Sequence, residues 1–126
     1  MPATTITNIH TVGIDVRDQD AALDFYVDTL GFEKRLDAPI SDEMRWIEVA
    51  PEGITPSIAL NLSEDPTGEP NDTGIRFLVP DVDAEHAAMA ERGVDVGEVL
   101  RWDGVPAMYS FDDPDGNRFY IVEETQ

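Results

Sequence analysis

The sequence predicts an α+β fold, because one order of elements occurs twice along the chain of 126 residues. The stretches VGIDVRDQDAALDFYVDTLGF and IRFLVPDVDAEHAAMAERGV each contain a strand, an acidic turn, a helix and a glycine, and three extended segments follow each of them. An internal repeat of this length indicates two tandem βαβββ modules, neither of which can bury its sheet alone. We therefore expect a half-open curved sheet or barrel with the helices outside and a concave, ligand-sized face.

The first module covers about residues 5–62. Alternation of apolar residues predicts a strand over Ile6–Val16, with Ile6, His10, Val12, Ile14 and Val16 on one side. Asp18 or Asp20 can cap the helix that follows, and Gly31 can end it. The three extended segments of this module are Phe32–Leu36, Glu43–Ala50 and Ser57–Leu62.

A polar segment rich in proline and glycine, residues 63–73, predicts a linker, and the second module covers about residues 74–124 of a single domain, 1–126. Its strand is expected at Ile75–Val79, and Asp81 or Asp83 can cap its helix, which Gly93 ends. The extended segments are Val94–Arg101, Ala107–Phe111 and Arg118–Val122. DPDGN predicts a turn that joins the last two as a hairpin.

The composition is acidic, with 27 Asp and Glu, 8 Lys and Arg, no cysteine and a formal net charge of −19. Such a charge disfavours nucleic acid and anionic membranes as partners. Dispersed acids with almost no lysine indicate adaptation to a salt-rich cytoplasm, and the alternative is an acidic protein of ordinary salt. The expected location is cytoplasmic, because no signal peptide or apolar run of membrane length is found.

Four motifs carry a resemblance to a known family: IHTVGIDVRD, ALDFYVDTLGF, DVDAEHAAMAERGV and DDPDGNRFYIVE, in that order along nearly the whole chain. Together they resemble the vicinal oxygen chelate superfamily, which includes glyoxalase I, extradiol dioxygenases, fosfomycin resistance enzymes and bleomycin-binding proteins. The resemblance implies the paired βαβββ fold and a homodimer. It says little about the reaction, because function lies in a site built on the fold.

The resemblance also implies where a metal would be held. His10 matches the family's first ligand position, but Gly74, Tyr120 and Ala59 occupy the other three. Glycine and alanine have no ligating atom, and a neutral phenol is a poor ligand. No metal or other cofactor is therefore expected, although a divalent metal is not excluded. The residues considered for a rescue of metal binding are Glu48, Glu123 and His86; we expect Glu123 on the face opposite Tyr120 and His86 at the surface.

The candidate ligand-binding residues are His10, Trp46, Arg76, Met108, Ser110 and Tyr120. Arg76 could anchor an acidic group, or it could pair with one of the many acids of the chain. Trp46 could stack on an aromatic ligand or pack in the core. Met108 and Ser110 share one face of their strand, so that Tyr109 and Phe111 are expected to face the helix.

These residues favour a superfamily member that binds a small molecule in its cavity without the family metal. One alternative is a metal-dependent glyoxalase-like lyase or isomerase, or a dioxygenase, with an unorthodox ligand set. Another is a metal-independent enzyme in which His10 and Tyr120 act as an acid–base pair. His10 could also be no more than a residue packed in the cavity wall.

Overall fold

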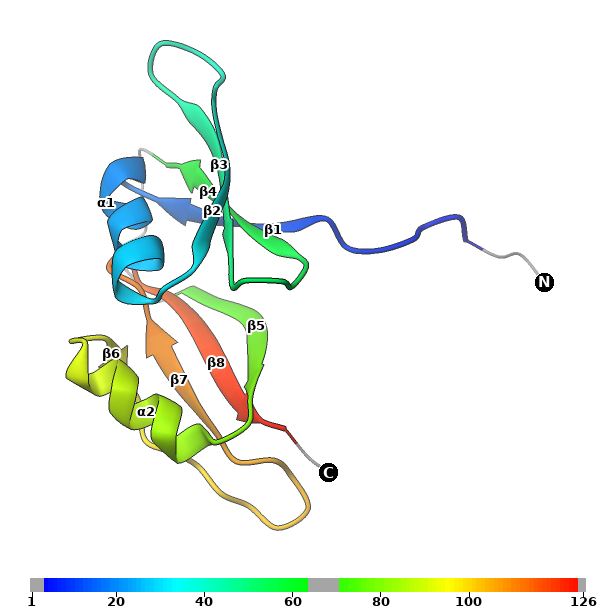
Figure 1. Cartoon of the computed structure of the whole chain (residues 1–126), viewed down its shortest axis with the longest axis vertical. Helices are drawn as coiled ribbons and strands as arrows, with labels where there is room; N and C mark the ends of the chain where they lie inside the picture. The colour runs from blue at the N-terminus through cyan, green and yellow to red at the C-terminus, as the bar shows by residue number, and fades with distance from the viewer. Residues whose placement is uncertain (1–3, 64–70, 125–126) are drawn as a thin grey trace. The chain divides into compact units, whose positions relative to one another are not determined.

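The computed structural model describes residues 4–63 and 71–124. The chain divides into two compact units, Met1–Leu62 and Ser63–Gln126, which are described separately (Figure 1). Each described unit has one helical segment and four strands, so the predicted α+β class and the tandem βαβββ order are confirmed. A half-open barrel made of both sheets concerns the arrangement of the units and stays a prediction.

Unit 1 contains one four-stranded sheet with the order β1-β4-β3-β2. Its elements are β1 (Thr11–Val16), α1 (Gln19–Leu23), η1 (Asp24–Thr29), β2 (Glu33–Pro39), β3 (Arg45–Ala50) and β4 (Ser57–Leu62). β1 is parallel to β4, and the other neighbours are antiparallel. Asp18 caps α1 by accepting a hydrogen bond from the Ala21 amide at 3.1 Å. The helix continues into η1 as a π-helix, in which the Leu30 amide donates to the Phe25 carbonyl.

Unit 2 repeats this topology, with the strand order β5-β8-β7-β6. Its elements are β5 (Asn71–Val79), α2 (Val82–Glu91), β6 (Asp95–Val96), β7 (Met108–Asp112) and β8 (Asn117–Glu123). β5 is parallel to β8, as β1 is to β4. Asp81 caps α2 with the same extended backbone that Asp18 has, and Gly31 and Gly93 follow the two helical segments with positive φ angles of 84°. The predicted helix signals are therefore confirmed in both units.

The first strand is shorter than predicted. β1 begins at Thr11, so residues 4–10 precede it, extend away from the sheet and are exposed (Figure 1). Ile6, for example, is 77% exposed. The cause lies in the partner strand, because β4 begins at Ser57, which pairs with Thr11, and Pro56 before it has no amide to donate.

The second module departs from the prediction at two boundaries. β5 begins at Asn71, so the end of the predicted linker is strand, while residues 64–70 lie outside the described residues. β6 ends at Val96, although the Gly97 amide still donates to the Ser110 carbonyl at 2.8 Å. Gly97 lies so close to β7 that a Cβ there would be 2.9 Å from Ser110 Oγ. Beyond it, the predicted strand survives only as a bridge between Leu100 and Met108.

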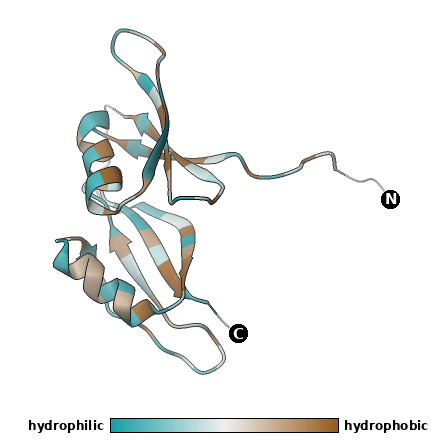
Figure 2. Cartoon of the chain, viewed as in Figure 1, coloured by the Kyte–Doolittle hydropathy of each residue, from teal (hydrophilic) through white to brown (hydrophobic). Residues whose placement is uncertain are grey.

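Burial alternates along β7 and most of β8, as predicted, whereas β3 and β4 each have four consecutive buried residues. Figure 2 shows hydrophobic and hydrophilic residues interspersed along the strands. In β7, Tyr109 and Phe111 are buried and face α2, where the Tyr109 hydroxyl contacts Met89 Sδ at 3.3 Å. Met108 and Ser110 lie half-buried on the other face. The assignment of these four residues to two faces is therefore confirmed.

Candidate functional site

Tyr120 is the centre of a polar group on unit 2. β8 carries it on the half-buried face, and its hydroxyl donates a hydrogen bond to Asp72 Oδ2 at 2.5 Å. Asp72 lies near the start of β5, where a register shift separates it from Arg76. The Arg76 guanidinium lies 5.0 Å from the centre of the Tyr120 ring, within the range of a cation–π contact.

The hydrogen bond shifts the pKa of both partners. Donation to Asp72 raises the pKa of Tyr120, because the neutral phenol is held by a carboxylate. The same bond, with help from the Gly74 amide, lowers the pKa of Asp72. Tyr120 is therefore a poor general base near neutral pH. Its phenol is suited to hydrogen bonding and to stacking.

Arg76 makes no salt bridge to a carboxylate within residues 4–63 and 71–124. Its Nη1 donates instead to the carbonyl of Gly74 at 3.0 Å, and the side chain is exposed. Of the two interpretations of Arg76, the ion pair is thus not the one that the structure shows. The guanidinium keeps donors that can receive a ligand.

A hollow of about 200 Å³ in unit 2 brings three of the candidate residues together, namely Met108, Ser110 and Tyr120. Glu98, Leu100 and Tyr109 complete its lining. The hollow therefore offers an adaptable thioether wall, an aromatic edge and two hydroxyl groups. Such a combination can hold a small, largely apolar molecule and orient it through a few hydrogen bonds.

Unit 1 carries a second polar group, built around Glu48. This side chain of β3 is only 6% exposed. Trp46 Nε1 donates to its Oε2 at 2.8 Å, and Ser57 Oγ donates to its Oε1 at 2.7 Å. His10 Nε2 lies 3.4 Å from Oε2, but the imidazole itself is 82% exposed. Two candidate residues, His10 and Trp46, thus meet at a buried carboxylate.

Glu48 is ionised at neutral pH in spite of its burial. The hydrogen bond from Trp46 lowers its pKa most, Ser57 and His10 lower it further, and desolvation opposes them. A buried carboxylate in this state fixes the orientation of the Trp46 indole, which remains 37% exposed. Of the two interpretations of Trp46, packing entirely in the core is therefore not the one that the structure shows.

The strand registers show which positions of the two units correspond. In unit 1 one residue of β4 pairs with a residue of β1 on one side and a residue of β3 on the other, and in unit 2 one residue of β8 pairs in the same way with β5 and β7. The matching sets are Gly13, Ala59 and Glu48 in unit 1 and Arg76, Tyr120 and Ser110 in unit 2. Gly74 lies inside the register shift between Asp72 and Arg76, so the pairing of β5 with β8 gives it no matching position in β1, and His10 lies one residue before β1.

The residues at the four family positions do not fit a metal. Ala59 and Gly74 have no donor atom, and the phenol of Tyr120 is bound to Asp72. Among the described residues, no group of three or more His, Asp or Glu is placed to hold a metal ion. A divalent ion needs about three or more protein ligands, so we derive no step through a metal.

Two other residues considered for metal binding have structural contacts. Glu123 Oε2 accepts a hydrogen bond from the Val82 amide at 3.1 Å, at the start of α2 and on the face opposite Tyr120. His86 Nε2 lies 2.8 Å from the Gly97 carbonyl, and its ring packs edge-on against Tyr109. The prediction that His86 is a plain surface residue is thus wrong, because it fastens α2 to the segment after β6.

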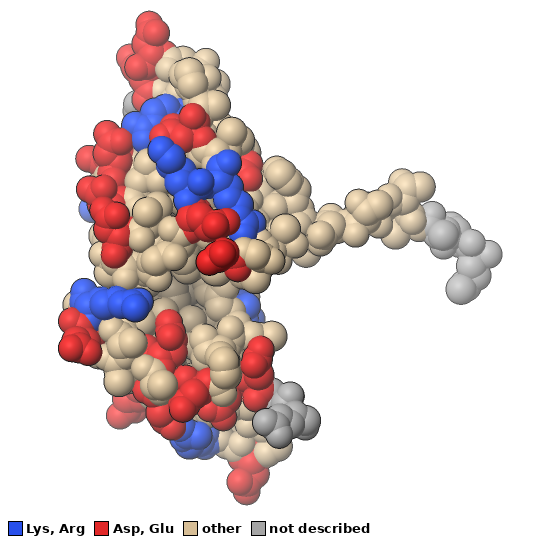
Figure 3. All heavy atoms as spheres, viewed as in Figure 1, with Lys and Arg blue, Asp and Glu red and all other residues tan. Residues whose placement is uncertain are grey.

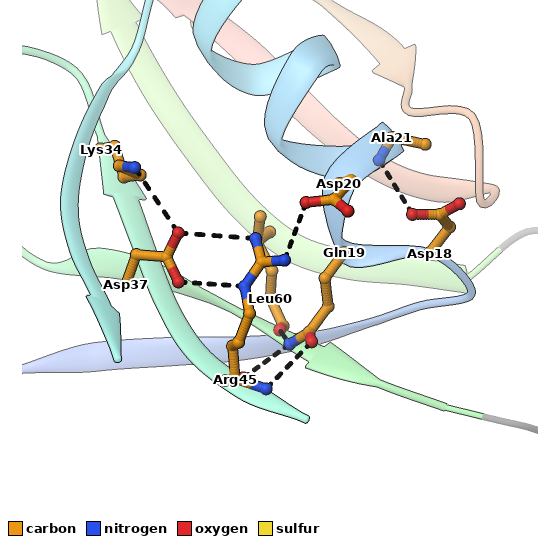
Figure 4. Close-up of polar contacts among 8 residues, drawn as sticks. All are labelled: Asp18, Gln19, Asp20, Ala21, Lys34, Asp37, Arg45 and Leu60. Carbon is orange, nitrogen blue, oxygen red and sulfur yellow. Dashed lines mark hydrogen bonds and ion pairs between the residues drawn. The ribbon is translucent and has the colours of Figure 1, made fainter. Parts of the chain in front are cut away.

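A larger hollow of about 460 Å³ in unit 1 lies beside the polar network of Figure 4. There Arg45 contacts Asp20 at 2.8 Å and Asp37 at 3.0 Å. Gln19 is buried, and its amide donates to the carbonyls of Arg45 and Leu60, which joins α1 to β3 and β4. Arg45, Asp18 and Asp20 of this hollow already have partners, which cap α1 and hold it against the sheet, so we assign it a structural role.

Carboxylates cover both units on the face shown in Figure 3, with basic side chains between them. Among the described residues there is no helix of sufficient length and hydropathy to cross a membrane.

Comparison with known proteins identifies the family. The model of the Glyoxalase/Bleomycin resistance protein/Dioxygenase superfamily matches residues 8–121. The chain belongs to this superfamily. A superfamily member from Sphaerobacter thermophilus DSM 20745 has 39% sequence identity and a TM-score of 0.85, and the alignment covers 96% of this chain and 100% of that one.

Two further proteins are similar to this chain over nearly its whole length. TnmS3, an antibiotic binding protein from Streptomyces sp. CB03234, has 34% identity and a TM-score of 0.83, with 98% of this chain and 100% of that chain covered. The uncharacterized protein YetH of Bacillus subtilis (strain 168) is 31% identical over 122 residues, which are 94% of this chain and 99% of YetH. The resemblance inferred from the four motifs is thus confirmed.

In this chain, two residues of the candidate site, Glu48 and Asp72, have roles that the sequence does not reveal. Glu48 is one of many acids, and only the pairing of β3 with β4 places it beside Ser57. Asp72 falls inside the predicted linker, yet the parallel pairing of β5 with β8 brings it to Tyr120. The sequence signal that could have indicated Asp72 as a site residue is its position two residues before Gly74, near the start of the strand.

Proposed function

We propose that this protein binds a small aromatic molecule without the family metal, as a sequestering or resistance-type protein. The observation that carries the proposal is the hollow of unit 2, where Met108, Ser110 and Tyr120 meet, while only His10 of the four family metal positions carries a good ligand. Arg76 and Trp46 add exposed groups that can contact a ligand. The antibiotic binding by TnmS3, at 34% identity, supports the same class of function.

The proposal extends to the assembly and the location of the protein. We propose a homodimer in the cytoplasm, because the resemblance implies a dimer and the acidic charge suits a salt-rich interior. Light scattering on the protein in high and low salt tests the dimer. A monomer at every salt concentration contradicts it.

The first experiment measures metal content in protein purified in high salt, without chelator and without nickel affinity resin. We expect far less than stoichiometric zinc, nickel, iron or manganese. Titration calorimetry with each of these ions should show no specific binding. Near-stoichiometric metal, or turnover that a chelator abolishes and metal restores, contradicts the proposal and favours the metal-dependent enzyme.

The second experiment tests ligand binding with three tricyclic probes: acridine, 9-aminoacridine and 9-anthracenecarboxylate. Binding is followed by calorimetry and by a shift in melting temperature. We expect at least one probe to bind, and Met108→Phe, which narrows the hollow, to weaken that binding. Val105→Phe is the control, because Val105 is exposed and outside the lining. Failure of all three probes to bind contradicts the proposed function.

A further inference from the structure

Glu48 is a buried negative charge that lacks a permanent cationic partner. No lysine or arginine among the described residues makes a salt bridge to it. Its oxygens accept from the neutral donors of Trp46 and Ser57, at 2.8 and 2.7 Å. A buried carboxylate is costly unless it is paired, and two neutral hydrogen bonds leave acceptor positions free.

Among the residues that the structure describes, His10 is the cation-forming group that contacts this carboxylate, and it is held weakly. His10 Nε2 is 3.4 Å from Oε2, longer than a strong charge-assisted hydrogen bond, and the imidazole is 82% exposed. His10 ends an exposed segment, and its backbone is held because the His10 carbonyl accepts a hydrogen bond from the Ser57 amide at 3.1 Å. The segment also has a long side-chain bond, from Asn8 to Thr55 at 3.5 Å. The imidazole can therefore leave without disturbing the sheet, and its departure uncovers Oε2.

The Trp46 indole lies at the same place. It shares the face of β3 with Glu48, and its N–H is fixed to the carboxylate, so part of the ring stays exposed in one orientation. An exposed indole beside a carboxylate suits an aromatic ring that bears a positive charge, through stacking and cation–π contact. The net charge of −19 further raises the local concentration of cations.

We propose that Glu48 and Trp46 form a subsite for a protonated amine carried by an aromatic ligand, and that the amine takes the place of His10. The subsite rests on the proposed function and names the chemical class of its ligand. Glu48 receives the ammonium by a charge-assisted hydrogen bond, and Trp46 supports the adjoining ring. Ser57 positions Glu48 and does not contact the ligand.

The test compares the three tricyclic probes in mildly alkaline buffer at high salt, where 9-aminoacridine is a cation, acridine is neutral and 9-anthracenecarboxylate is an anion. We expect the cation to bind most tightly to the natural sequence. Glu48→Gln keeps an oxygen for Trp46 and removes the charge, so its affinity for the cation should fall about tenfold or more. Affinity for acridine should change little.

Two variants make the test specific. Glu52→Gln alters the net charge by the same amount at an exposed position of the β3–β4 turn, and it should leave the affinity unchanged. His10→Ala removes the competing imidazole at an exposed site, so the affinity for 9-aminoacridine should rise severalfold. A change in the indole N–H signal of Trp46 in a ¹⁵N spectrum should accompany binding of the cation.

The outcomes separate the two proposals. Equal affinity for the cation and for acridine, or equal effects of Glu48→Gln and Glu52→Gln, overturns the amine subsite and leaves the proposed function standing. A loss of cation binding in His10→Ala also overturns it, because His10 would then be a contact. If none of the probes binds, both proposals fail together.

Discussion

The two units have the same topology but fill their cores with different kinds of side chain. The positions that face the helix correspond through the strand registers. They are Ile47, Val49 and Ile58 in unit 1 and Tyr109, Phe111 and Phe119 in unit 2, all at most 1% exposed. Aliphatic and aromatic cores thus support one strand order, which shows that the pattern of burial sets this topology rather than the identity of the residues.

The opposite faces differ more. Unit 1 has a glycine, an alanine and a buried carboxylate where unit 2 has Arg76, Tyr120 and Ser110. The charge of unit 1 is enclosed by Trp46 and Ser57, while the polar group of unit 2 is exposed. The duplicated scaffold therefore keeps its cores equivalent in role and its open faces different in chemistry.

The largest effect should come from truncating the aromatic core. Phe119 is 0% exposed and stacks on Phe111 at 5.2 Å between ring centres. Phe119→Ala should lower the free energy of unfolding by about 3–5 kcal/mol, because it removes a large buried side chain and leaves a cavity. Denaturant unfolding followed by circular dichroism measures it. Leu78→Ala, at a position 68% exposed, is the control, and similar losses in both variants would contradict the assignment of the core.

A smaller effect should separate the open faces. Glu48→Ala removes the acceptor for Trp46 and Ser57, so it should cost about 1–3 kcal/mol. Ser110→Ala, at the matching position of unit 2, should cost less than about 0.5 kcal/mol, since its side chain is half-buried and its loss leaves no buried charge. The same unfolding experiment gives both values. Equal costs would contradict the view that, of these two matching positions, Glu48 alone encloses a charge.

Glu48 should also make the stability depend on pH. Its pKa in the folded protein is lowered, whereas an unfolded glutamate has a pKa of about 4.3. As the pH falls, the unfolded chain takes up the proton first, so the stabilisation by the Glu48 charge is present above about pH 4.3 and is lost as the pH falls through the folded pKa. Unfolding of the natural sequence and of Glu48→Gln at a series of pH values should therefore show a difference that shrinks in this window. A constant difference would mean that the charge of Glu48 contributes nothing.

The smallest effect should come from the exposed pair of unit 2. Tyr120→Phe should change stability by only about 0.2–1 kcal/mol, because solvent competes for both partners. Asp72→Asn should lower the pKa of Tyr120, since the bond to Asp72 is the largest cause of its raised value. A carbon-13 titration of the tyrosine rings follows this pKa. An unchanged pKa would show that the two side chains do not meet in solution.

Much of each unit could be predicted from local signals. The caps Asp18 and Asp81, the glycines after the helices and the alternation in β7 and β8 depend on neighbours along the chain, and the sequence displays them directly. The start of β1 could not be predicted, because it depends on where its partner strand β4 begins, at Ser57.

The site follows the same division. Met108, Ser110 and Tyr120 could be placed together from alternation within β7 and β8. The bond from Tyr120 to Asp72 and the enclosure of Glu48 depend on pairings between strands and on side-chain conformations, which periodicity does not encode. Local patterns therefore identify which residues face the hollow, and tertiary pairing decides which charges are enclosed.

The separation of the strand pairings into two sets bears on how the protein is made. Every strand of the first sheet comes from the chain before Ser63, and every strand of the second sheet comes after it. A ribosome releases the N-terminal half first, so all four strands of the first sheet can meet while the second half is still being synthesised. No pairing in that sheet has to wait for the end of translation. The nascent chain can thus shield its first apolar surface early, in a polypeptide that no disulfide holds together.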